Sequence, residues 1–357
     1  MQDMARIFNG LGQSLWLDNI TRGMLRAGTL EKYREECAVT GLTSNPTIFE
    51  NAIKGGSDYD EAIRADGSTD PEAVFFGLAI DDLRQAAKVF EPVHARTSGV
   101  DGWVSLEVSP LLADDTAHTI EQALALHQRA GIDNLYIKVP GTTAGAAAIE
   151  ELIYRGVPIN VTLLFSAKQY RAVAEAYIKG LERRLAEGLS LDVASVASVF
   201  ISRWDVKVAK AVPEEMHNEL GLAVAGSVYA SYRAVLESPR MQRLMNAGAR
   251  PQRLLWASTG TKDPNASDTL YVDNLVAPLT VNTLPEKTLL ATADHGKPGD
   301  GMSADDSAAR AVQNRFAERG LRVDELAEAL QDEGAASFVK SWNDLLDAIR
   351  QRMEKAA

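Results

Sequence analysis

Short apolar segments are spread along the chain between longer stretches with a helical pattern. In "NLYIKVPGT" (134–142), Leu135, Ile137 and Val139 are separated by single residues, one of which is Lys138. This alternation is typical of β-strands, because successive side chains of a strand point to opposite faces. The pattern predicts eight strands, at residues 14–20, 37–45, 102–110, 134–142, 157–166, 193–202, 253–259 and 279–285.

The stretches between these strands have the apolar period and the end signals of helices. Asp70, Asp115 or Thr116, and Ser166 stand where three of the helices begin, and Gly188 stands where the third one ends. Strands that alternate with helices predict a parallel sheet, and eight strands allow it to close. We therefore predict an α/β fold, a (β/α)8 TIM barrel that forms a single domain over residues 1–357.

Two parts of the chain exceed a minimal barrel. Residues 46–101 predict extra helices between strands two and three, and residues 303–355 predict a helical C-terminal tail. The tail has an apolar stripe at helical spacing, formed by Phe338, Trp342, Leu345, Ile349 and Met353. We expect this stripe to pack on the barrel rather than on a partner protein.

Composition narrows the classes of partner. The chain has 357 residues, of which 46% are hydrophobic, and a formal net charge of −12. This charge argues against nucleic acid or anionic lipid as the main partner, but a few local cations are enough to bind a small phosphorylated molecule. Cys37 is the only cysteine, which excludes an intrachain disulfide, and we expect it to be a buried structural thiol.

Location and assembly follow less directly from the sequence. Met1–Gly10 lacks the basic start and apolar run of a secretion signal, and no stretch approaches about 18 consecutive apolar residues. The sequence therefore predicts a cytoplasmic protein without a membrane span. The oligomeric state stays open, and a homodimer is one of the alternatives.

Polar residues collect at the predicted strand ends, where barrels of this kind hold their active sites. They are Asp18, Thr43, Asn45, Glu107, Lys138, Asn160, Thr162, Ser198, Ser202 and Arg203. Each has a structural explanation when it is taken alone: Asp18 could cap a helix, and Lys138 with Glu107 could form only a buried ion pair. One ion pair would not call for further polar groups at the same rim, so their convergence favours a functional site.

The residue types at this rim favour covalent chemistry by a lysine. The sequence has no H-E-x-x-H motif, no carboxylate triad at metal spacing and no dinucleotide fingerprint, so we expect neither a metal nor a cofactor. A lysine buried among apolar side chains has a lowered pKa, and the neutral amine can attack a carbonyl to form a Schiff base. That reaction needs an acid/base and groups that bind hydroxyls, and Glu107, Asp18 and the Asn, Ser and Thr residues supply them.

With these residues the chain resembles the transaldolase family over essentially its whole length. "GLTSNPTIF" (41–49) is similar to the family's T-S-N-P signature, and "LYIKVPGTTAG" (135–145) is similar to its active-site lysine signature. The resemblance implies a (β/α)8 barrel that transfers a dihydroxyacetone unit between sugar phosphates in the pentose phosphate pathway, without a cofactor. The implied donors are sedoheptulose 7-phosphate or fructose 6-phosphate, and the implied acceptors are glyceraldehyde 3-phosphate or erythrose 4-phosphate.

The resemblance also implies roles for single residues. Lys138 would form the Schiff base, with Glu107 and Thr162 as its acid/base through a water. Asp18 would take the proton of the substrate's C4 hydroxyl. The substrate would be bound by the remaining members of the set, which are Asn45, Asn160 and Ser198 at its hydroxyls, Phe200 in the wall, and Arg203 and Ser258 at its phosphate.

One position departs from the family pattern. Many members have an arginine two positions after the serine of strand seven, whereas Ser258 is followed here by Thr259, Gly260, Thr261 and Lys262. We predict that Lys262 replaces that arginine as the second phosphate-binding cation. The alternative is a solvated loop lysine.

Two other functions remain open at this stage. A fructose 6-phosphate aldolase would use the same scaffold to release free dihydroxyacetone. Those enzymes are similar to this chain but shorter, with Gln in place of Glu107 and Tyr in place of Phe200, so the resemblance favours transaldolase. A barrel that only binds sugar phosphates is the non-enzymatic alternative, and it would have no use for a nucleophile beside an acid/base.

Overall fold

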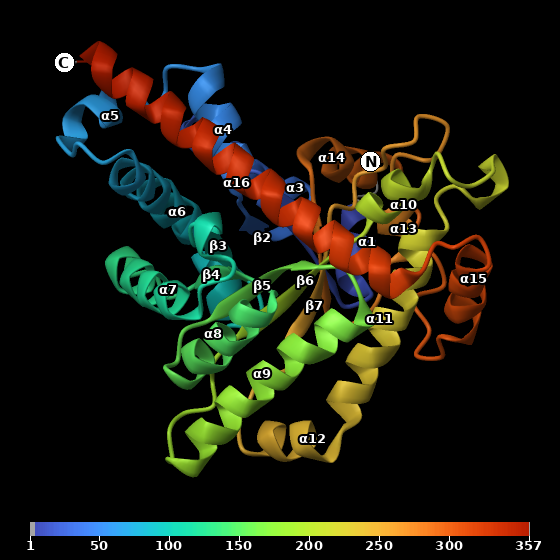
Figure 1. Cartoon of the computed structure of the whole chain (residues 1–357). Coiled ribbons are helices and arrows are strands. Elements are labelled where there is room, and N and C mark those ends of the chain that lie inside the picture. The colour runs from blue at the N-terminus through green and yellow to red at the C-terminus, as the bar shows by residue number, and fades with distance from the viewer. Residues whose placement is uncertain (1–3, 357) are drawn as a thin grey trace.

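Eight parallel strands form one sheet in the computed structural model, which describes residues 4–356 (Figure 1). Their order is β2-β1-β8-β7-β6-β5-β4-β3. The strands are β1 (Gln13–Asp18), β2 (Val39–Thr43), β3 (Val104–Glu107), β4 (Leu135–Pro140), β5 (Ile159–Leu164), β6 (Ser195–Phe200), β7 (Arg253–Ala257) and β8 (Thr280–Leu284). Each predicted strand is present, and each is somewhat shorter than its sequence pattern.

The two strands at the ends of this order, β2 and β3, bring the sheet close to a closed barrel. The Leu42 N–H donates to the carbonyl of Trp103, and the Gly102 N–H donates to the carbonyl of Thr40, both at 2.9 Å. Gly41 makes this approach feasible, because a Cβ there would lie 2.7 Å from the Trp103 carbonyl oxygen. The predicted TIM barrel is confirmed.

Helices surround the sheet at the predicted places. They are α1 (Met4–Gly10), α2 (Arg22–Arg26), α3 (Thr29–Glu36), α7 (Thr116–Ala130), α8 (Thr143–Tyr154), α9 (Ala167–Ala186), α10 (Ser202–Val208), α11 (Leu220–Glu237), α12 (Pro239–Asn246), α13 (Leu270–Asn274) and α14 (Glu286–His295), with 3₁₀ turns at Pro110–Leu112 and Glu214–Met216. The side chains of Asp115 and Ser166 accept hydrogen bonds from the first turns of α7 and α9. These caps confirm the predicted helix starts.

The two predicted additions to the barrel are also present. Helices α4 (Pro46–Gly55), α5 (Asp60–Asp66) and α6 (Pro71–Arg96) lie between β2 and β3, and the tail forms α15 (Ser307–Ala317) and α16 (Val323–Ala356). Helix α16 crosses the molecule and contacts α4, α5, α6 and β5 (Figure 1). Four residues of its stripe are buried and Met353 is half-buried, and the Trp342 ring meets the Phe75 ring edge-on at 5.1 Å. The expectation that the stripe packs within the chain is confirmed.

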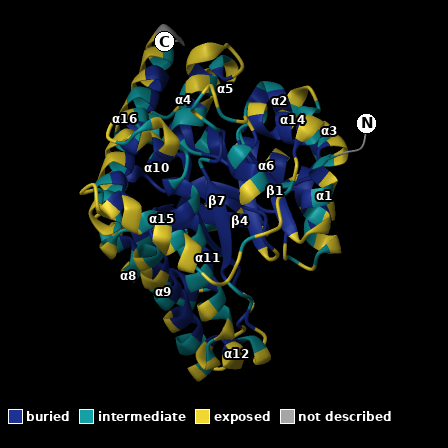
Figure 2. Cartoon of the chain, turned by 90° about the vertical axis from the view of Figure 1, so that its right-hand side faces the viewer, coloured by how far each residue is buried: buried dark blue, intermediate teal, exposed yellow. Residues whose placement is uncertain are grey.

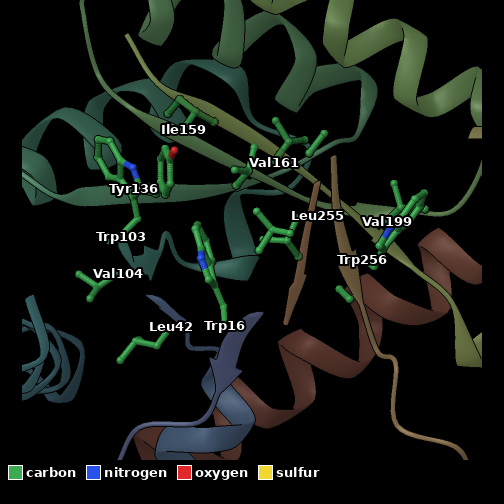
Figure 3. Close-up of a cluster of buried hydrophobic side chains, with 14 of the residues drawn as sticks. Trp16, Leu42, Trp103, Val104, Tyr136, Ile159, Val161, Val199, Leu255 and Trp256 are labelled. Carbon is green, nitrogen blue, oxygen red and sulfur yellow. The ribbon is translucent and has the colours of Figure 1, made fainter. Parts of the chain in front are cut away.

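Aromatic and charged side chains fill the barrel interior towards the N-terminal ends of the strands. The strands are buried along their length (Figure 2), and aromatic side chains gather inside them (Figure 3). Trp103 stacks on Tyr136 with ring centroids 4.2 Å apart, and the indole N–H of Trp16 donates to Asp101 at 2.7 Å. Arg253 lies in the same floor, 4.0 Å from Asp101. This charged floor has no counterpart in the sequence prediction.

Two further expectations can be compared with the fold. Cys37 is buried directly after α3, which fits a structural thiol. Within residues 4–356, none of the helices combines the length and the apolar character that a membrane crossing requires. Residues 1–3, which belong to the segment compared with a secretion signal, lie outside the described part of the chain. Residue 357, the last of the predicted domain, also lies outside it.

Candidate active site

A cavity of about 340 Å³ lies at the C-terminal ends of the strands. It is lined by nine of the eleven residues to which the sequence analysis assigned roles, namely Asp18, Asn45, Lys138, Thr162, Ser198, Phe200, Arg203, Ser258 and Lys262. Glu107 and Asn160, the other two, are buried beside lining residues to which they are bonded. The fold therefore brings together the whole predicted set, which comes from segments spread over most of the chain.

Lys138 and Glu107 form a buried pair at the base of the cavity. The register of β3 and β4 places them opposite each other, so both side chains point into the barrel. The Lys138 Nζ lies 3.0 Å from Glu107 Oε2, and the side chains are only 6% and 4% exposed. Nζ also donates to the Ser44 carbonyl at 3.1 Å, whereas the ring centroid of Phe338 lies 5.7 Å away. The immediate surroundings of the amine are thus polar and not the apolar wall expected from the sequence.

Burial sets the acidity of the two carboxyl groups nearest to Lys138. Desolvation raises the pKa of Glu107, and the positive charge of Lys138 opposes this shift. Desolvation likewise raises the pKa of Asp18, against the charge of Lys138 and a 2.8 Å hydrogen bond from the Thr43 hydroxyl. Two carboxyl groups with raised pKa values beside one lysine can exchange protons with a reacting group, which is what acid/base chemistry requires.

Thr162 lines the cavity at a bulge in β5. Val161 pairs with Ala197, but the next pair is Leu164 with Val199, so that two residues of β5 oppose one of β6. The Thr162 hydroxyl is buried and has no hydrogen-bond partner among residues 4–356. A buried hydroxyl without a protein partner is suited to a substrate or a water.

The remaining amide and hydroxyl groups are held by their neighbours. The Asn45 side-chain oxygen accepts the Ile48 N–H at 3.1 Å and so caps α4 at the edge of the cavity. Asn160 accepts a hydrogen bond from the Ser198 hydroxyl at 2.7 Å and donates to Ser105 at 3.1 Å. Asn160 is fully buried, so Ser198 stands between it and the cavity.

Two cations line the cavity without bonded partners of their own. Arg203 lies 5.0 Å from the Phe200 ring centroid and 6.0 Å from that of Phe338, and burial lowers its pKa. In the described part of the chain, neither Arg203 nor Lys262 forms a hydrogen bond or an ion pair. Lys262 is exposed but lines the same cavity as Arg203 and Ser258, and a guanidinium and an ammonium at one cavity suit an anionic group.

The tail helix supplies a cavity residue that the sequence did not assign to the site. Phe338 of α16 lines the cavity beside Lys138 and Arg203. Its place in the apolar stripe predicted burial, but nothing local in the sequence indicated which part of the barrel it would cover. Among residues 4–356 no group of histidine, cysteine and acidic side chains has a geometry that could hold a metal ion.

The fold and the cavity define a TIM-barrel protein with a site centred on a buried lysine. A family model described as Transaldolase/Fructose-6-phosphate aldolase matches residues 15–349, and the chain belongs to this family. It is 43% identical to a transaldolase of Parafrankia sp. (strain EAN1pec) over 97% of both chains. It is 46% identical to a transaldolase of Thermobifida fusca (strain YX) over 96% of both. It is also 42% identical to a transaldolase of Mycobacterium tuberculosis (strain ATCC 25618 / H37Rv), over 97% of this chain and 96% of that protein.

Proposed function

We propose that this chain is a transaldolase that transfers a dihydroxyacetone unit from a ketose phosphate to an aldose phosphate in the pentose phosphate pathway. The donors are sedoheptulose 7-phosphate or fructose 6-phosphate, and the acceptors are glyceraldehyde 3-phosphate or erythrose 4-phosphate. The observation that carries the proposal is the Lys138 amine 3.0 Å from Glu107 in a cavity that also holds hydroxyl-binding groups and two cations.

The first step is attack of the Lys138 Nζ on the C2 carbonyl of the ketose. Desolvation raises the pKa of Glu107, so its carboxyl group can hold a proton 3.0 Å from the amine and exchange it with the reacting groups. Addition gives a carbinolamine, and protonation of its hydroxyl by Glu107 releases water and leaves an iminium. Thr162, whose hydroxyl has no protein partner among the described residues, positions the water that serves this proton transfer.

The second step breaks the C3–C4 bond. Asp18 takes the proton of the C4 hydroxyl, the aldose leaves, and the electron pair moves into the iminium to give an enamine on Lys138. The acceptor aldehyde then reacts with the enamine in the reverse sense, and hydrolysis of the new iminium frees Lys138. Asp18 faces the same cavity from β1, and its raised pKa suits a group that accepts and returns one proton.

Substrate binding is divided between the two ends of the cavity. Asn45 and Ser198 bind hydroxyls of the three-carbon unit. Asn160 accepts a hydrogen bond from the Ser198 hydroxyl and so acts on that unit through Ser198. Phe200 forms part of the wall, and Arg203, Ser258 and Lys262 bind the phosphate. Arg203 is half-buried against two rings and has no protein anion bonded to it among the described residues, so it can bind phosphate oxygens in a bidentate manner.

An assay with and without an acceptor tests this function. Incubation with fructose 6-phosphate alone should release little free dihydroxyacetone, because the three-carbon unit stays on Lys138. Addition of erythrose 4-phosphate should start multiple turnover to sedoheptulose 7-phosphate and glyceraldehyde 3-phosphate. Rapid release of dihydroxyacetone without an acceptor would instead identify an aldolase. Glu107 and Phe200 favour the first outcome, since the aldolases that this chain resembles carry Gln and Tyr there.

Other expectations from the sequence stay predictions. They are a single domain over residues 1–357, a cytoplasmic location, and partners restricted to sugar phosphates and, as one alternative, a second copy of the chain. Light scattering tests the last of these.

A further inference from the structure

The C-terminal helix α16 is bonded directly to the ends of two active-site strands. The side-chain amide of Gln331 donates to the carbonyl of Leu163 at 2.9 Å and to the carbonyl of Gly141 at 3.1 Å. Gly141 follows β4, which carries Lys138, and Leu163 follows Thr162 in β5. One amide group thus joins the ends of the strands that hold the nucleophile and its proposed proton-transfer partner.

The carbonyl of Leu163 belongs to the β5 bulge. The extra residue of a bulge interrupts the regular ladder of backbone hydrogen bonds, and Leu163 has a positive φ of 59°, which is uncommon for a bulky side chain. Such a conformation persists only where surrounding contacts hold it. Gln331 supplies one of them, and on the other side of β5 the Gly141 N–H donates to the Thr162 carbonyl at 2.7 Å.

Neighbouring positions of α16 fit the same region. Gly334 is one turn away from Gln331, and a Cβ at this position would lie 2.9 Å from Leu163 Cδ2 and 3.1 Å from Arg203 Nη1. Phe338, one further turn along, lines the cavity. Residues at this spacing share one helix face, so a single face of α16 lies against the bulge, Arg203 and the cavity.

We propose that Gln331 is a positioning residue for the reaction. By bonding the Leu163 carbonyl it holds the bulge in the conformation that directs the Thr162 hydroxyl toward the site, and it thereby sets the rate of imine formation and hydrolysis. This inference rests on the proposed function, because it assigns Gln331 an effect on the imine steps of that reaction. Gln331 touches no substrate in this account and acts only through Thr162.

Gln331→Glu tests the proposal with a nearly isosteric side chain. The carboxylate lacks the two N–H donors and repels both carbonyl oxygens. Gln313 on α15 offers a matched control: its side-chain amide donates to the Ala223 carbonyl at 2.9 Å and to the Ser227 hydroxyl at 2.8 Å, and both glutamines are half-buried. We expect Gln331→Glu to slow imine formation roughly ten- to a hundredfold, as small displacements of catalytic groups do. Gln313→Glu should change it by less than about twofold.

A double-mutant cycle with Thr162→Val separates positioning from a general structural role. The measured rate is that of imine formation with fructose 6-phosphate. The imine is trapped by borohydride at set times, and its amount is divided by the amount of lysine that can be trapped. If Gln331 acts through Thr162, then Gln331→Glu slows this rate in the wild-type background but by less than about twofold in the Thr162→Val background. An equal loss in both backgrounds, or a loss in Gln313→Glu as large as in Gln331→Glu, would overturn the proposal.

Two further controls keep the result interpretable. Should Gln331→Glu not fold, Gln331→Met, which also lacks donors but carries no charge, takes its place in the cycle. Failure of both variants to fold would assign Gln331 a structural role and also overturn the proposal. The wild-type chain is measured first: absence of a trapped imine there refutes the proposed function, whereas a trapped imine with an unaffected Gln331→Glu rate refutes only the positioning role.

Discussion

Replacement of Glu107 by glutamine removes the group that pairs with the proposed nucleophile and keeps its shape. In the wild-type protein Glu107 Oε2 lies 3.0 Å from the Lys138 Nζ, and both side chains are nearly inaccessible to water. The amide of Glu107→Gln can still accept a hydrogen bond from Lys138, but it cannot take or return a proton. The variant therefore separates proton transfer from packing.

The structure sets the size of the expected effects. A positioned general acid/base contributes about 10²–10⁴-fold, so we expect imine formation to slow by a factor in this range. Removal of one partner of a buried ion pair costs about 3–5 kcal/mol when the other partner stays charged. Here the amine can lose its proton and keeps its hydrogen bond to the Ser44 carbonyl, so we expect the free energy of unfolding to fall by no more than about 3 kcal/mol.

Two measurements check this prediction. Rapid mixing with fructose 6-phosphate, followed by borohydride trapping, gives the rate of imine formation, and urea unfolding gives the stability. Burial raises the pKa of Glu107, so the wild-type rate should rise with pH through a value above that of an ordinary glutamate, as the carboxylate becomes available to take the lysine proton. The Glu107→Gln profile should lack this rise.

A matched control is Glu328→Gln, which breaks the exposed ion pair between Glu328 and Lys168 (3.3 Å) and should alter neither measurement appreciably. Near-wild-type imine formation in Glu107→Gln would refute the assigned role. If Glu107→Gln did not fold, the pair would be needed for the fold. The role of Glu107 in imine formation would then be tested by the pH profile of the wild-type protein.

Three other variants extend the test. Asp18→Asn should still form the trapped imine with fructose 6-phosphate but lose turnover by about a hundredfold or more, since only the bond-breaking step needs this carboxylate; loss of trapping would contradict its role. Lys262→Ala should raise KM about tenfold or more for phosphorylated donors and leave unphosphorylated donors unchanged, with the exposed Lys287→Ala as control; an equal effect on both donors would defeat the phosphate contact. His295→Gln should lower the Tm more at about pH 5.5 than at about pH 9. Hydrogen bonds to two aspartates raise the pKa of His295 in the folded protein. Its stabilisation is therefore complete below about pH 6.5 and is lost as the pH rises through the pKa of the folded state. A Tm difference that does not change with pH would contradict this linkage.

The parts of the fold that the sequence predicted are those with local signals. Short apolar segments marked all eight strands, and side-chain caps such as Asp115 and Ser166 marked helix starts, because both patterns depend on neighbouring residues alone. The site followed because parallel strands of a barrel end at one face, which made polar residues at strand ends converge. The pairing of Glu107 with Lys138 was left open, since it depends on a register that a shift of one residue would destroy.

The parts that the sequence did not predict depend on contacts between distant segments. Helical spacing identified the buried stripe of α16, but the angle at which the helix crosses the barrel decides that Phe338 faces Lys138. The bulge at Leu163 likewise has no residue signature in β5, because a leucine rather than a glycine takes the positive φ. Its bond from Gln331 joins residues far apart in the chain, and no local pattern could reveal it.

Borohydride reduction in the presence of fructose 6-phosphate, followed by mass mapping of the peptides, tests most directly whether Lys138 is the nucleophile. We expect one reduced adduct, located on Lys138, and we expect Lys138→Arg to lose both the adduct and turnover. An adduct on any other lysine, or sustained turnover by a chain without an amine at residue 138, would contradict it.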